Sequence, residues 1–388
     1  MPVLNRVAEL HDEVTGWRRE IHSNPELQYD VHETAAKVAG LLEEFGVDEI
    51  VTGIGRTGVV GIINGNKTDS GKTVGLRADM DALPMSEETG KEYASKVEGK
   101  MHACGHDGHT AMLLGAAKYL SETRNFNGKV ALIFQPAEEG GAGAKAMVDD
   151  GMMDRFGITE VYGMHNFPGL PVGKFAMREG TLLASADLLE ITMKGKGGHA
   201  AKPHGCVDPI VAASAAVQAI QSFASRNVDP LNSVVVSITQ FHAGTAFNII
   251  PQEAHLSGTV RCLDEHVRDL VEKRVMEIVT HVALAHGCTA EVKYERMYPP
   301  TINHVAQVRF AGEVARSVAG DDNVDMDTPP VMGGEDFSFM LEARPGAFLY
   351  VGNGDSAGLH HPAYDFNDDA IPHGISFLAE LVHKSMPA

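Results

Sequence analysis

Side chains able to bind a metal ion follow four apolar runs of the sequence, TVGLRADMD, KVALIFQPAEE, EVYGMHN and AFLYVGN. Along the chain these side chains are Asp79, Asp81, Glu138, Glu139, His165, His360 and His361. In an open α/β sheet, ligands bind in the crevice beyond the carboxyl ends of the strands. If the four runs are strands of one sheet, we expect these carboxylates and imidazoles to converge there.

Two further donors come from the segment HACGHDGH at residues 102–109, which we predict to be a loop before a helix that starts near Thr110. Cys104 and His106 stand two residues apart in it, so both can face one centre. Thiolate and imidazole together favour zinc and neighbouring metals. A single histidine is more often a surface or core residue. Several donors at successive strand ends therefore indicate a metal site more strongly than any one of them.

The adjacent pair Glu138 and Glu139 fits a division of labour. We expect Glu139 to bind metal and Glu138 to act as a general base. A metal lowers the pKa of its bound water toward neutrality, and a carboxylate within hydrogen-bond reach removes the proton as the water attacks a carbonyl. The alternative for Glu138 is an ordinary acidic residue at the start of a surface helix.

The order of the apolar patterns predicts an α/β fold in two domains. Residues 1–183 and 295–388 form a discontinuous catalytic domain, with a mixed, mostly parallel sheet sandwiched by helices. Residues 184–294 follow the order strand, helix, strand, strand, helix, strand, which is typical of a ferredoxin-like α+β unit. We expect this inserted unit to be a lid, and its strand edge and helix face to be possible surfaces for a homodimer or higher homo-oligomer.

Composition narrows the choice of partners. The formal charge of −20 repels phosphate backbones and anionic lipids, which argues against nucleic acid or a membrane as partner. No run approaches the roughly 20 apolar residues of a membrane span, and the charged start of the chain does not resemble a signal peptide. Four sparse cysteines suit a reducing compartment. We therefore expect a cytoplasmic protein that acts on a small molecule.

Two motifs point elsewhere but lack the required context. GIGRTG at 53–58 matches GxGxxG, yet a β-rich run follows it and not a helix, so we predict a tight turn between strands. GDSAG at 354–358 matches the nucleophile elbow around Ser356, but the following LHHPAYDF shows no helical period. A serine hydrolase remains the weaker alternative.

Nine motifs together resemble one metallopeptidase family, which contains hippurate hydrolases, aminoacylases and plant auxin-conjugate hydrolases. They are WRREIHSNPEL at 17–27, RADMDALP at 77–84, MHACGHDGHTAMLLGAA at 101–117, QPAEEGGAGAKAM at 135–147, GMHNFP at 163–168, GKGGHAAKPH at 195–204, NIIP at 248–251, GGEDF at 333–337 and LHHPAYDFND at 359–368. The resemblance is closest to the hippurate hydrolase branch and spans nearly the whole chain.

The resemblance implies a two-metal site and hydrolysis of N-acyl amino acids of the hippurate or N-acetyl type. The implied ligands are Cys104, His106, Glu139, His165 and His360. It makes Cys104 the bridging ligand, keeps Glu138 as general base for a metal-bound hydroxide, and selects His360 over His361. The wider family commonly has a histidine ligand near residue 79 and a bridging aspartate, so the roles of Asp79 and Asp81 stay open. We expect both to orient the ligating side chains.

The resemblance also assigns substrate contacts in the inserted unit. It implies that His199 polarises the scissile carbonyl, and that Asn248 and Arg261 hold the free carboxylate of the substrate, with backbone amides of Gly333 and Gly334 nearby. The alternative for Arg261 is a peripheral ion pair.

Several questions stay open on the sequence alone. Zn or Mn are the expected metals, with Co or Ni as alternatives. Two rival functions remain: a dipeptidase or carboxypeptidase of the same family, and a catalytically silent ligand-binding relative.

Overall fold

The computed structural model of the protein describes residues 4–388, so the first three residues of the predicted first domain lie outside the described part. The chain forms two compact units. Unit 1 comprises Met1–Gly180, Ile302–Pro329 and Asp336–Ala388, and unit 2 comprises Thr181–Thr301 and Pro330–Glu335. These bounds differ from the predicted ones chiefly in the short return of residues 330–335 to unit 2.

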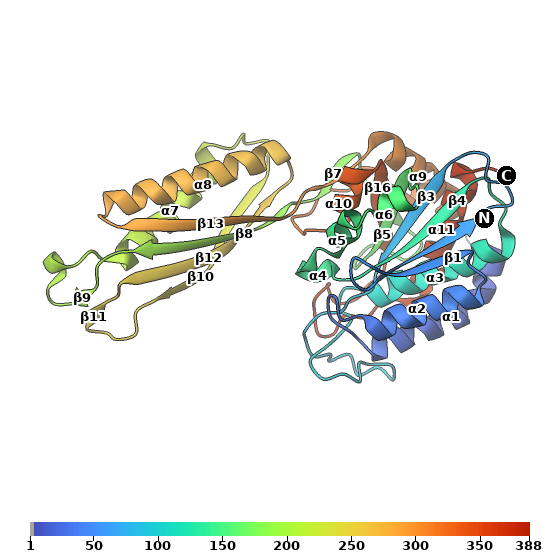
Figure 1. The fold of residues 1–388 in the computed structure, drawn as a ribbon, viewed down its shortest axis with the longest axis horizontal. Helices are drawn as coiled ribbons and strands as arrows, with labels where there is room; N and C mark the ends of the chain where they lie inside the picture. The colour runs from blue at the N-terminus through green and yellow to red at the C-terminus, as the bar shows by residue number, and fades with distance from the viewer. Residues whose placement is uncertain (1–3) are drawn as a thin grey trace. The chain divides into compact units, whose positions relative to one another are not determined.

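Unit 1 is built on an eight-stranded sheet (Figure 1). Its strands are β1 (Glu49–Ile54), β2 (Gly58–Asn64), β3 (Thr73–Asp79), β4 (Lys129–Gln135), β5 (Glu160–Phe167), β6 (Phe175–Ala176), β15 (Val324–Asp325) and β16 (Gly346–Gly352). The spatial order is β1-β2-β4-β3-β5-β16-β6-β15. The four central strands β4, β3, β5 and β16 run parallel. Strand β1 pairs antiparallel with β2, β2 with β4, and β6 with β16, whereas β15 pairs parallel with β6. The predicted mixed, mostly parallel sheet is therefore confirmed.

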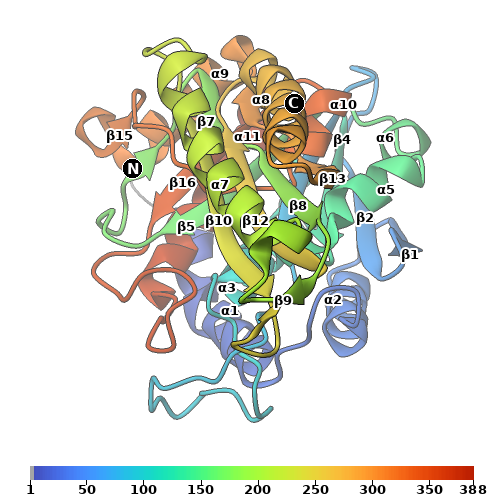
Figure 2. The same cartoon turned by 90° about the vertical axis from the view of Figure 1, so that its left-hand side faces the viewer.

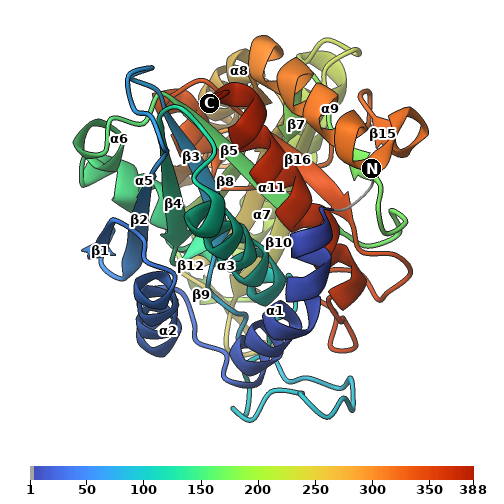
Figure 3. The ribbon, with the colours of Figure 1, turned by 90° about the vertical axis from the view of Figure 1, so that its right-hand side faces the viewer.

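Helices flank this sheet. They are α1 (Asn5–Ser23), α2 (His32–Glu44), α3 (His106–Thr123), α4 (Glu138–Gly141), α5 (Gly143–Asp149), α6 (Met152–Arg155), α9 (Val305–Ala319), α10 (Ser338–Ala343) and α11 (Ile371–Ser385). Figure 3 shows α1, α3 and α11 in front of the central strands. These three helices place Val14, Leu114 and Ile375 in one hydrophobic core, which burial stabilises. The core holds the central strands in place beneath the site described below.

Unit 2 contains a four-stranded antiparallel sheet of order β10-β12-β8-β13 and two long helices. Its main elements are β8 (Ala186–Lys194), α7 (Pro209–Arg226), β10 (Val234–Ala243), β12 (Glu253–Cys262), α8 (Glu265–Ala285) and β13 (Thr289–Tyr298). Strands β8 and β12 alternate buried and less buried residues, and α7 and α8 lie side by side against the sheet (Figures 1 and 2). The chain order and strand order are those of the ferredoxin-like unit predicted from the sequence.

Short elements complete the chain. Unit 2 also has β9 (Gly198–His199), β11 (Ile249–Ile250) and a 3-10 turn at Pro203–Gly205, while β7 (Gly180–Leu183) and β14 (Thr301–Asn303) fall where the chain passes from one unit to the other. In unit 1, 3-10 turns occupy Asp321–Asn323 and Asp368–Ala370.

Neither GIGRTG at 53–58 nor GDSAG at 354–358 is followed directly by a helix, as predicted. Gly53, with φ 82°, lies in β1 where its pairing with β2 is irregular, and Gly55, with φ 57°, begins the turn that joins β1 to β2, so GIGRTG opens no helix. The Ser356 hydroxyl donates to the carbonyl oxygen of Ala357 and lies 3.0 Å from the Asn353 amide nitrogen. The next α-helix after Ser356 is α11, fifteen positions further on. Among residues 4–388, none of the helices combines the length and apolar character that crossing a membrane requires.

Candidate metal centre

The candidate site lies at the carboxyl ends of the parallel strands of unit 1. Asp79 is the last residue of β3, the Glu138–Glu139 pair follows β4, His165 lies near the end of β5, and His360 follows β16. Because these four strands are parallel, their carboxyl ends share one edge of the sheet. The expected convergence of the donors is thus produced by the topology.

The turn Cys104–Gly105–His106 brings two donors to this edge. Gly105 has φ 89°, and a Cβ there would stand 2.2 Å from Oδ1 of Asn166, so only glycine fits between the two donors. Helix α3 begins at His106. The prediction of a helix start near Thr110 was therefore wrong, because the left-handed Gly105 ends the loop earlier and places His106 in the first turn.

Among residues 4–388, five groups of three donors lie close enough together to hold a metal ion, and two of these groups share Cys104. Cys104, His106 and His165 offer ligand atoms that all lie within 4.8 Å of one another, and so do Cys104, Glu139 and His360. Cys104 belongs to both groups. All five predicted ligands are therefore brought together, in an arrangement suited to two ions that share one thiolate.

The imidazoles are oriented toward this centre by backbone carbonyls. His106 Nδ1 donates to the Asp81 carbonyl oxygen at 2.8 Å, which leaves a buried Nε2 without a hydrogen-bond partner. His165 Nδ1 donates to the Asn166 carbonyl oxygen at 2.7 Å, and its Nε2 lies 3.4 Å from Sγ of Cys104. A buried ring nitrogen without a hydrogen-bond partner is costly unless a cation occupies the position it faces. The donor set therefore fits a metal.

Asp81 holds the Glu138–Glu139 pair in place. Its carboxylate accepts the backbone N–H of Glu138 at 2.9 Å and that of Glu139 at 3.1 Å. The chain bends sharply around the pair, because Ala137 has φ 54° and Gly140 has φ 82°. Non-glycine residues in this region are strained and are often found at functional sites. Asp81 thus positions the carboxylates without belonging to either of the two overlapping donor groups.

Asp79 lies behind the imidazoles. Its Oδ1 is 2.6 Å from Nδ1 of His109, and its Oδ2 is 3.6 Å from Nε2 of His106. Arg77 donates to the same carboxylate at 2.8 Å and also reaches Asp336 at 3.1 Å. Although burial opposes its charge, Arg77 and the two histidines hold the pKa of Asp79 well below its ordinary value.

Sequence reasoning missed His109 and Arg77. His109 is buried and accepts the backbone N–H of Asn166 at its Nε2, 3.0 Å away. A signal was available, since His106 and His109 are three residues apart and such pairs face the same side of a helix. Arg77 offered a weaker signal: a charged residue inside an otherwise apolar strand.

His360 is the histidine of the doublet that joins a donor group. Its backbone has φ 61°, and its N–H donates to the Ala103 carbonyl oxygen at 2.8 Å. Its Nε2 lies 3.2 Å from Oε1 of Glu139. His361 instead accepts the backbone N–H of Ala363 at its Nδ1. A left-handed residue at position 360 thus turns one imidazole toward Glu139.

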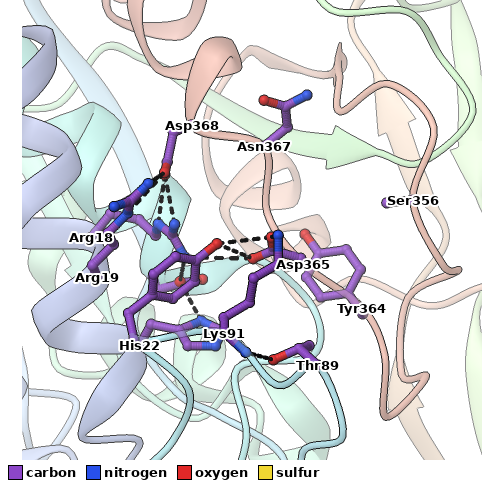
Figure 4. Close-up of polar contacts among 12 residues, drawn as sticks. Arg18, Arg19, His22, Thr89, Lys91, Ser356, Tyr364, Asp365, Asn367 and Asp368 are labelled. Atoms are coloured by element: carbon purple, nitrogen blue, oxygen red, sulfur yellow. Dashed lines mark hydrogen bonds and ion pairs between the residues drawn. The ribbon is translucent and has the colours of Figure 1, made fainter.

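The loop after His360 is anchored to α1 by charged side chains (Figure 4). Arg18 Nε donates to Asp368 at 2.8 Å, and Arg19 reaches the second oxygen of the same carboxylate. Tyr93 donates to Asp365 within the same network, and the Arg18 guanidinium lies 4.4 Å from the centre of the Tyr93 ring. The loop that carries His360 is therefore held by contacts far from it in the sequence.

The pKa shifts of Cys104, His106 and His165 are those expected of metal ligands in the absence of the metal. Burial raises the pKa of the Cys104 thiol well above its ordinary value, and the carboxylate of Glu139 raises it further. Burial opposes the charged form of His106, but the carboxylates of Asp79, Asp81 and Glu139 together outweigh it and raise the pKa of His106 to about 10. Burial lowers the pKa of His165. A divalent cation would relieve the repulsion among the acidic groups and favour the thiolate.

The predicted substrate-binding residues all belong to unit 2. His199 is exposed on β9, which pairs with β11, and the carbonyl oxygen of Asn248 accepts the N–H of Ala200 at 3.0 Å. His199 and Asn248 are therefore close neighbours.

A second pair lies elsewhere in unit 2. A Cβ at Gly334 would stand 3.7 Å from Nη1 of Arg261, so this guanidinium adjoins the Gly333–Gly334 segment. The Gly333 carbonyl oxygen accepts the N–H of Ala184 at 2.9 Å. Burial lowers the pKa of Arg261, and Asp187 partly opposes this shift.

Comparisons with known proteins agree on one family. The model of "Peptidase family M20/M25/M40" matches residues 75–384. The chain is 44% identical to a hippurate hydrolase of Campylobacter jejuni, over 99% of both chains, and 39% identical to an N-acetylcysteine deacetylase of Bacillus subtilis, over 96% of both. The solved structure of the Bacillus subtilis YXEP protein, a dinuclear metal-binding peptidase of the M20 family, is 35% identical with a TM-score of 0.86, covering 98% of this chain and 99% of that one.

Proposed function

The chain belongs to the peptidase family M20/M25/M40, and on this premise we propose that it is a metal-dependent amidohydrolase. It hydrolyses N-acyl amino acids to a carboxylic acid and a free amino acid. The observation that carries this function is the pair of donor groups that share Cys104, with the carboxylate of Glu138 grouped beside His106 and Glu139. A silent binding protein would have no need of this second carboxylate.

Two divalent metal ions are held per chain. In our proposal Cys104 bridges them, His106 and His165 complete one donor group, and Glu139 and His360 complete the other. When bound, the ions polarise the amide carbonyl and acidify the attacking water. We propose Zn or Mn as the native metals, with Co or Ni as alternatives, because thiolate, imidazole and carboxylate together admit all four.

Glu138 moves the proton in this scheme. Its carboxylate takes a proton from the attacking water as the new C–O bond forms, and delivers it to the amide nitrogen as the C–N bond breaks. Its backbone N–H is fixed by Asp81, so the side chain starts from a defined position. Its neighbour Glu139, whose N–H bonds to the other oxygen of the same carboxylate, is left for the metal.

Unit 2 supplies the substrate contacts in our proposal. Arg261 and the amides near Gly334 bind the free carboxylate, as a planar guanidinium does in a bidentate pair. Asn248 contributes to the same recognition. His199 polarises the scissile carbonyl and stabilises the negative charge that develops on its oxygen. Unit 2 would then act as a lid over the substrate.

Unit 2 also has a surface that suits self-association. Strand β10 is one of the two edge strands of its sheet, and Phe241 on it is 40% exposed. An exposed edge with apolar side chains can pair with a second copy of the same chain. We therefore propose a homodimer or higher homo-oligomer through unit 2. The four cysteines are free thiols, which supports our proposal that the enzyme works in a reducing compartment such as the cytoplasm.

The test of the function is hydrolysis of hippurate, a panel of N-acetyl amino acids and a panel of dipeptides by the purified protein. Each assay is run before chelation, after chelation, and after adding back Zn, Mn, Co or Ni. Activity on acyl amino acids that disappears and returns with metal supports the proposal. Activity confined to dipeptides would replace it with a dipeptidase, and no activity with any metal would reject it.

A further inference from the structure

Unit 1 contains a pocket of ≈ 380 Å³ beside the metal ligand Glu139. Its lining residues are Leu27, Gln28, Tyr29, Asp30, Arg56, Ala82, Pro84 and Glu139. We propose that this pocket receives the acyl group of the substrate and selects flat aromatic acyl groups, with Tyr29 and Arg56 as the residues that determine the preference. The inference rests on the proposed function and names its substrate class.

The pocket is attached to the segment that carries the catalytic carboxylates. Gln28 donates from its side chain to the carbonyl oxygen of Glu139 at 3.0 Å, and its own carbonyl oxygen accepts the N–H of Ala137 at 3.1 Å. The Tyr29 hydroxyl donates to the Gly141 carbonyl oxygen at 2.7 Å. A group bound between these walls therefore lies beside the reacting centre and not on a remote surface.

Two strained turns build the walls. Gln28, in the connection between α1 and α2, has φ 47°, and Arg56, in the turn between β1 and β2, has φ 79°. The turns are tied together, because the Thr57 hydroxyl donates to the Tyr29 carbonyl oxygen at 2.9 Å. Left-handed backbone at non-glycine residues persists where surrounding contacts enforce it, and such positions cluster at ligand-binding sites. The GIGRTG turn between β1 and β2 thus presents Arg56 to the pocket.

The second turn is rigid. The Gly55 N–H donates to the Asp150 carboxylate at 2.7 Å, and a Cβ at Gly55 would stand 2.6 Å from the Met147 side chain. Arg56 therefore projects from a turn that is packed against α5. A fixed starting point reduces the entropy that the long side chain loses when it contacts a ligand.

The chemistry of the walls favours a flat ring. The Arg56 guanidinium lies 4.0 Å from the centre of the Tyr29 ring. Within residues 4–388 it has no carboxylate within 4.0 Å, so its planar charge is not used in an ion pair. Guanidinium and aromatic faces stack on one another and on further aromatic groups. Leu27, Ala82 and Pro84 supply apolar surface around the stack. A benzoyl group offers a flat ring that can stack here, whereas an acetyl group offers none.

The other half of the substrate is accounted for elsewhere. The residues proposed to hold the amino acid carboxylate, Asn248, Arg261 and Gly334, belong to unit 2. The pocket beside Glu139 is made wholly of unit 1 residues, and it has been assigned to no part of the substrate. The acyl group is the remaining part that needs a pocket.

The experiment compares N-benzoylglycine with N-acetylglycine, which share the amino acid and differ in the acyl group. For the metal-loaded enzyme, Arg56→Ala and Tyr29→Ala are each expected to lower the ratio of kcat/KM for benzoyl over acetyl about tenfold. Tyr29→Phe keeps the ring and should keep the ratio. Arg155→Ala is the matched control, because Arg155 is also exposed and stacked, on Phe156, but is remote from the pocket lining.

Two results would overturn the inference. One is an unchanged ratio in both alanine variants while they still hydrolyse N-acetylglycine. The other is a selective loss of N-succinylglycine hydrolysis in Arg56→Ala, which would make the pocket a carboxylate site instead of an aromatic one.

A binding measurement separates this inference from the proposed function. By calorimetry, the metal-loaded wild type should bind benzoate about tenfold more tightly than acetate, and the two alanine variants should lose this preference. If the preference holds but no N-acyl amino acid is hydrolysed, the proposed function fails and the pocket stands. Equal binding of benzoate and acetate by the wild type would reject the pocket even in an active enzyme.

Discussion

Two buried clusters of ionisable side chains meet at the start of α3, and their charges are balanced differently. In the cluster around Asp107, cations face acids at short range. Arg18 Nη2 lies 2.7 Å from Oδ1 of Asp368 (Figure 4). His22 Nδ1 lies 2.8 Å from Oδ2 of Asp107. The side chains of Arg18, His22 and Asp107 are fully buried. We call these four residues the Asp107 cluster.

In the cluster around His106, the acidic groups are not matched by cationic side chains in the same way. Cys104, Glu138 and Glu139 gather beside His106, and burial raises the pKa of the thiol. Adjacent residues of a helix project about 100° apart, so His106 and Asp107 can serve two clusters. A charge-paired cluster holds the fold together by itself, whereas one with unmatched donors requires a bound cation.

The largest expected effect separates catalysis from folding in the His106 cluster. Glu138→Gln should lower kcat roughly 10²–10⁴-fold, because a general base of this kind contributes that much. The free energy of unfolding and the content of two metals should stay unchanged. Steady-state kinetics, urea unfolding and elemental analysis measure these three quantities, with Glu44→Gln at an exposed position of helix α2 as the control. Near wild-type turnover in Glu138→Gln would refute the base assignment.

The second effect is a loss of stability, expected in the Asp107 cluster. Arg18→Met should lower the free energy of unfolding by about 3–5 kcal/mol, because it removes a fully buried cation that faces both Asp107 and Asp368. The loss should be the same with and without metal. Urea unfolding in both states measures it, and Arg6→Met, which breaks an exposed pair with Glu122, should cost less than about 1 kcal/mol. A loss confined to the metal-loaded protein would place Arg18 in the metal site instead.

The third effect tests the shared ligand. Cys104→Ser should weaken metal binding by more than about 100-fold, the upper range for residues that only orient a ligand. In the metal-free protein it should change stability little, because the buried thiol is protonated there. Competition with a chelating dye measures affinity, and Cys206→Ser is the control. Retention of two tightly bound ions in Cys104→Ser would exclude a bridging role.

The smallest effect is a pH dependence of the Asp107 cluster. Burial opposes the charge of His22, but Asp107 outweighs it and raises the pKa of His22 to about 9. A raised pKa stabilises the fold fully below the unfolded value of about 6.5, and this contribution is lost as pH rises through 9.

The advantage of wild type over His22→Gln should therefore shrink, by up to about 3 kcal/mol, between pH 6 and pH 9.5. Urea unfolding in the presence of chelator measures it without interference from metal release. A constant difference across this range would show that His22 is not charged in the folded protein.

Local patterns in the sequence predicted most of the fold. The apolar period of HETAAKVAGLLEE and the alternation in DLLEITMK indicate α2 and β8, because these periods reflect which face is buried. Donors at the ends of successive parallel strands predicted the edge where the site forms. The resemblance to the metallopeptidase family predicted a set of metal ligands, and the structure brings these side chains together. Its individual roles stay predictions.

The sequence by itself therefore determined the elements, their order and the residue types that converge, since these depend on period and chain direction. Only the tertiary structure decided which groups touch. His360 turns toward Glu139 because its N–H bonds to Ala103, and His109 supports Asp79 because β3 and α3 pack together. Arg18 meets Asp368 across 350 positions. No local pattern encodes such contacts, because they depend on how distant segments pack in three dimensions.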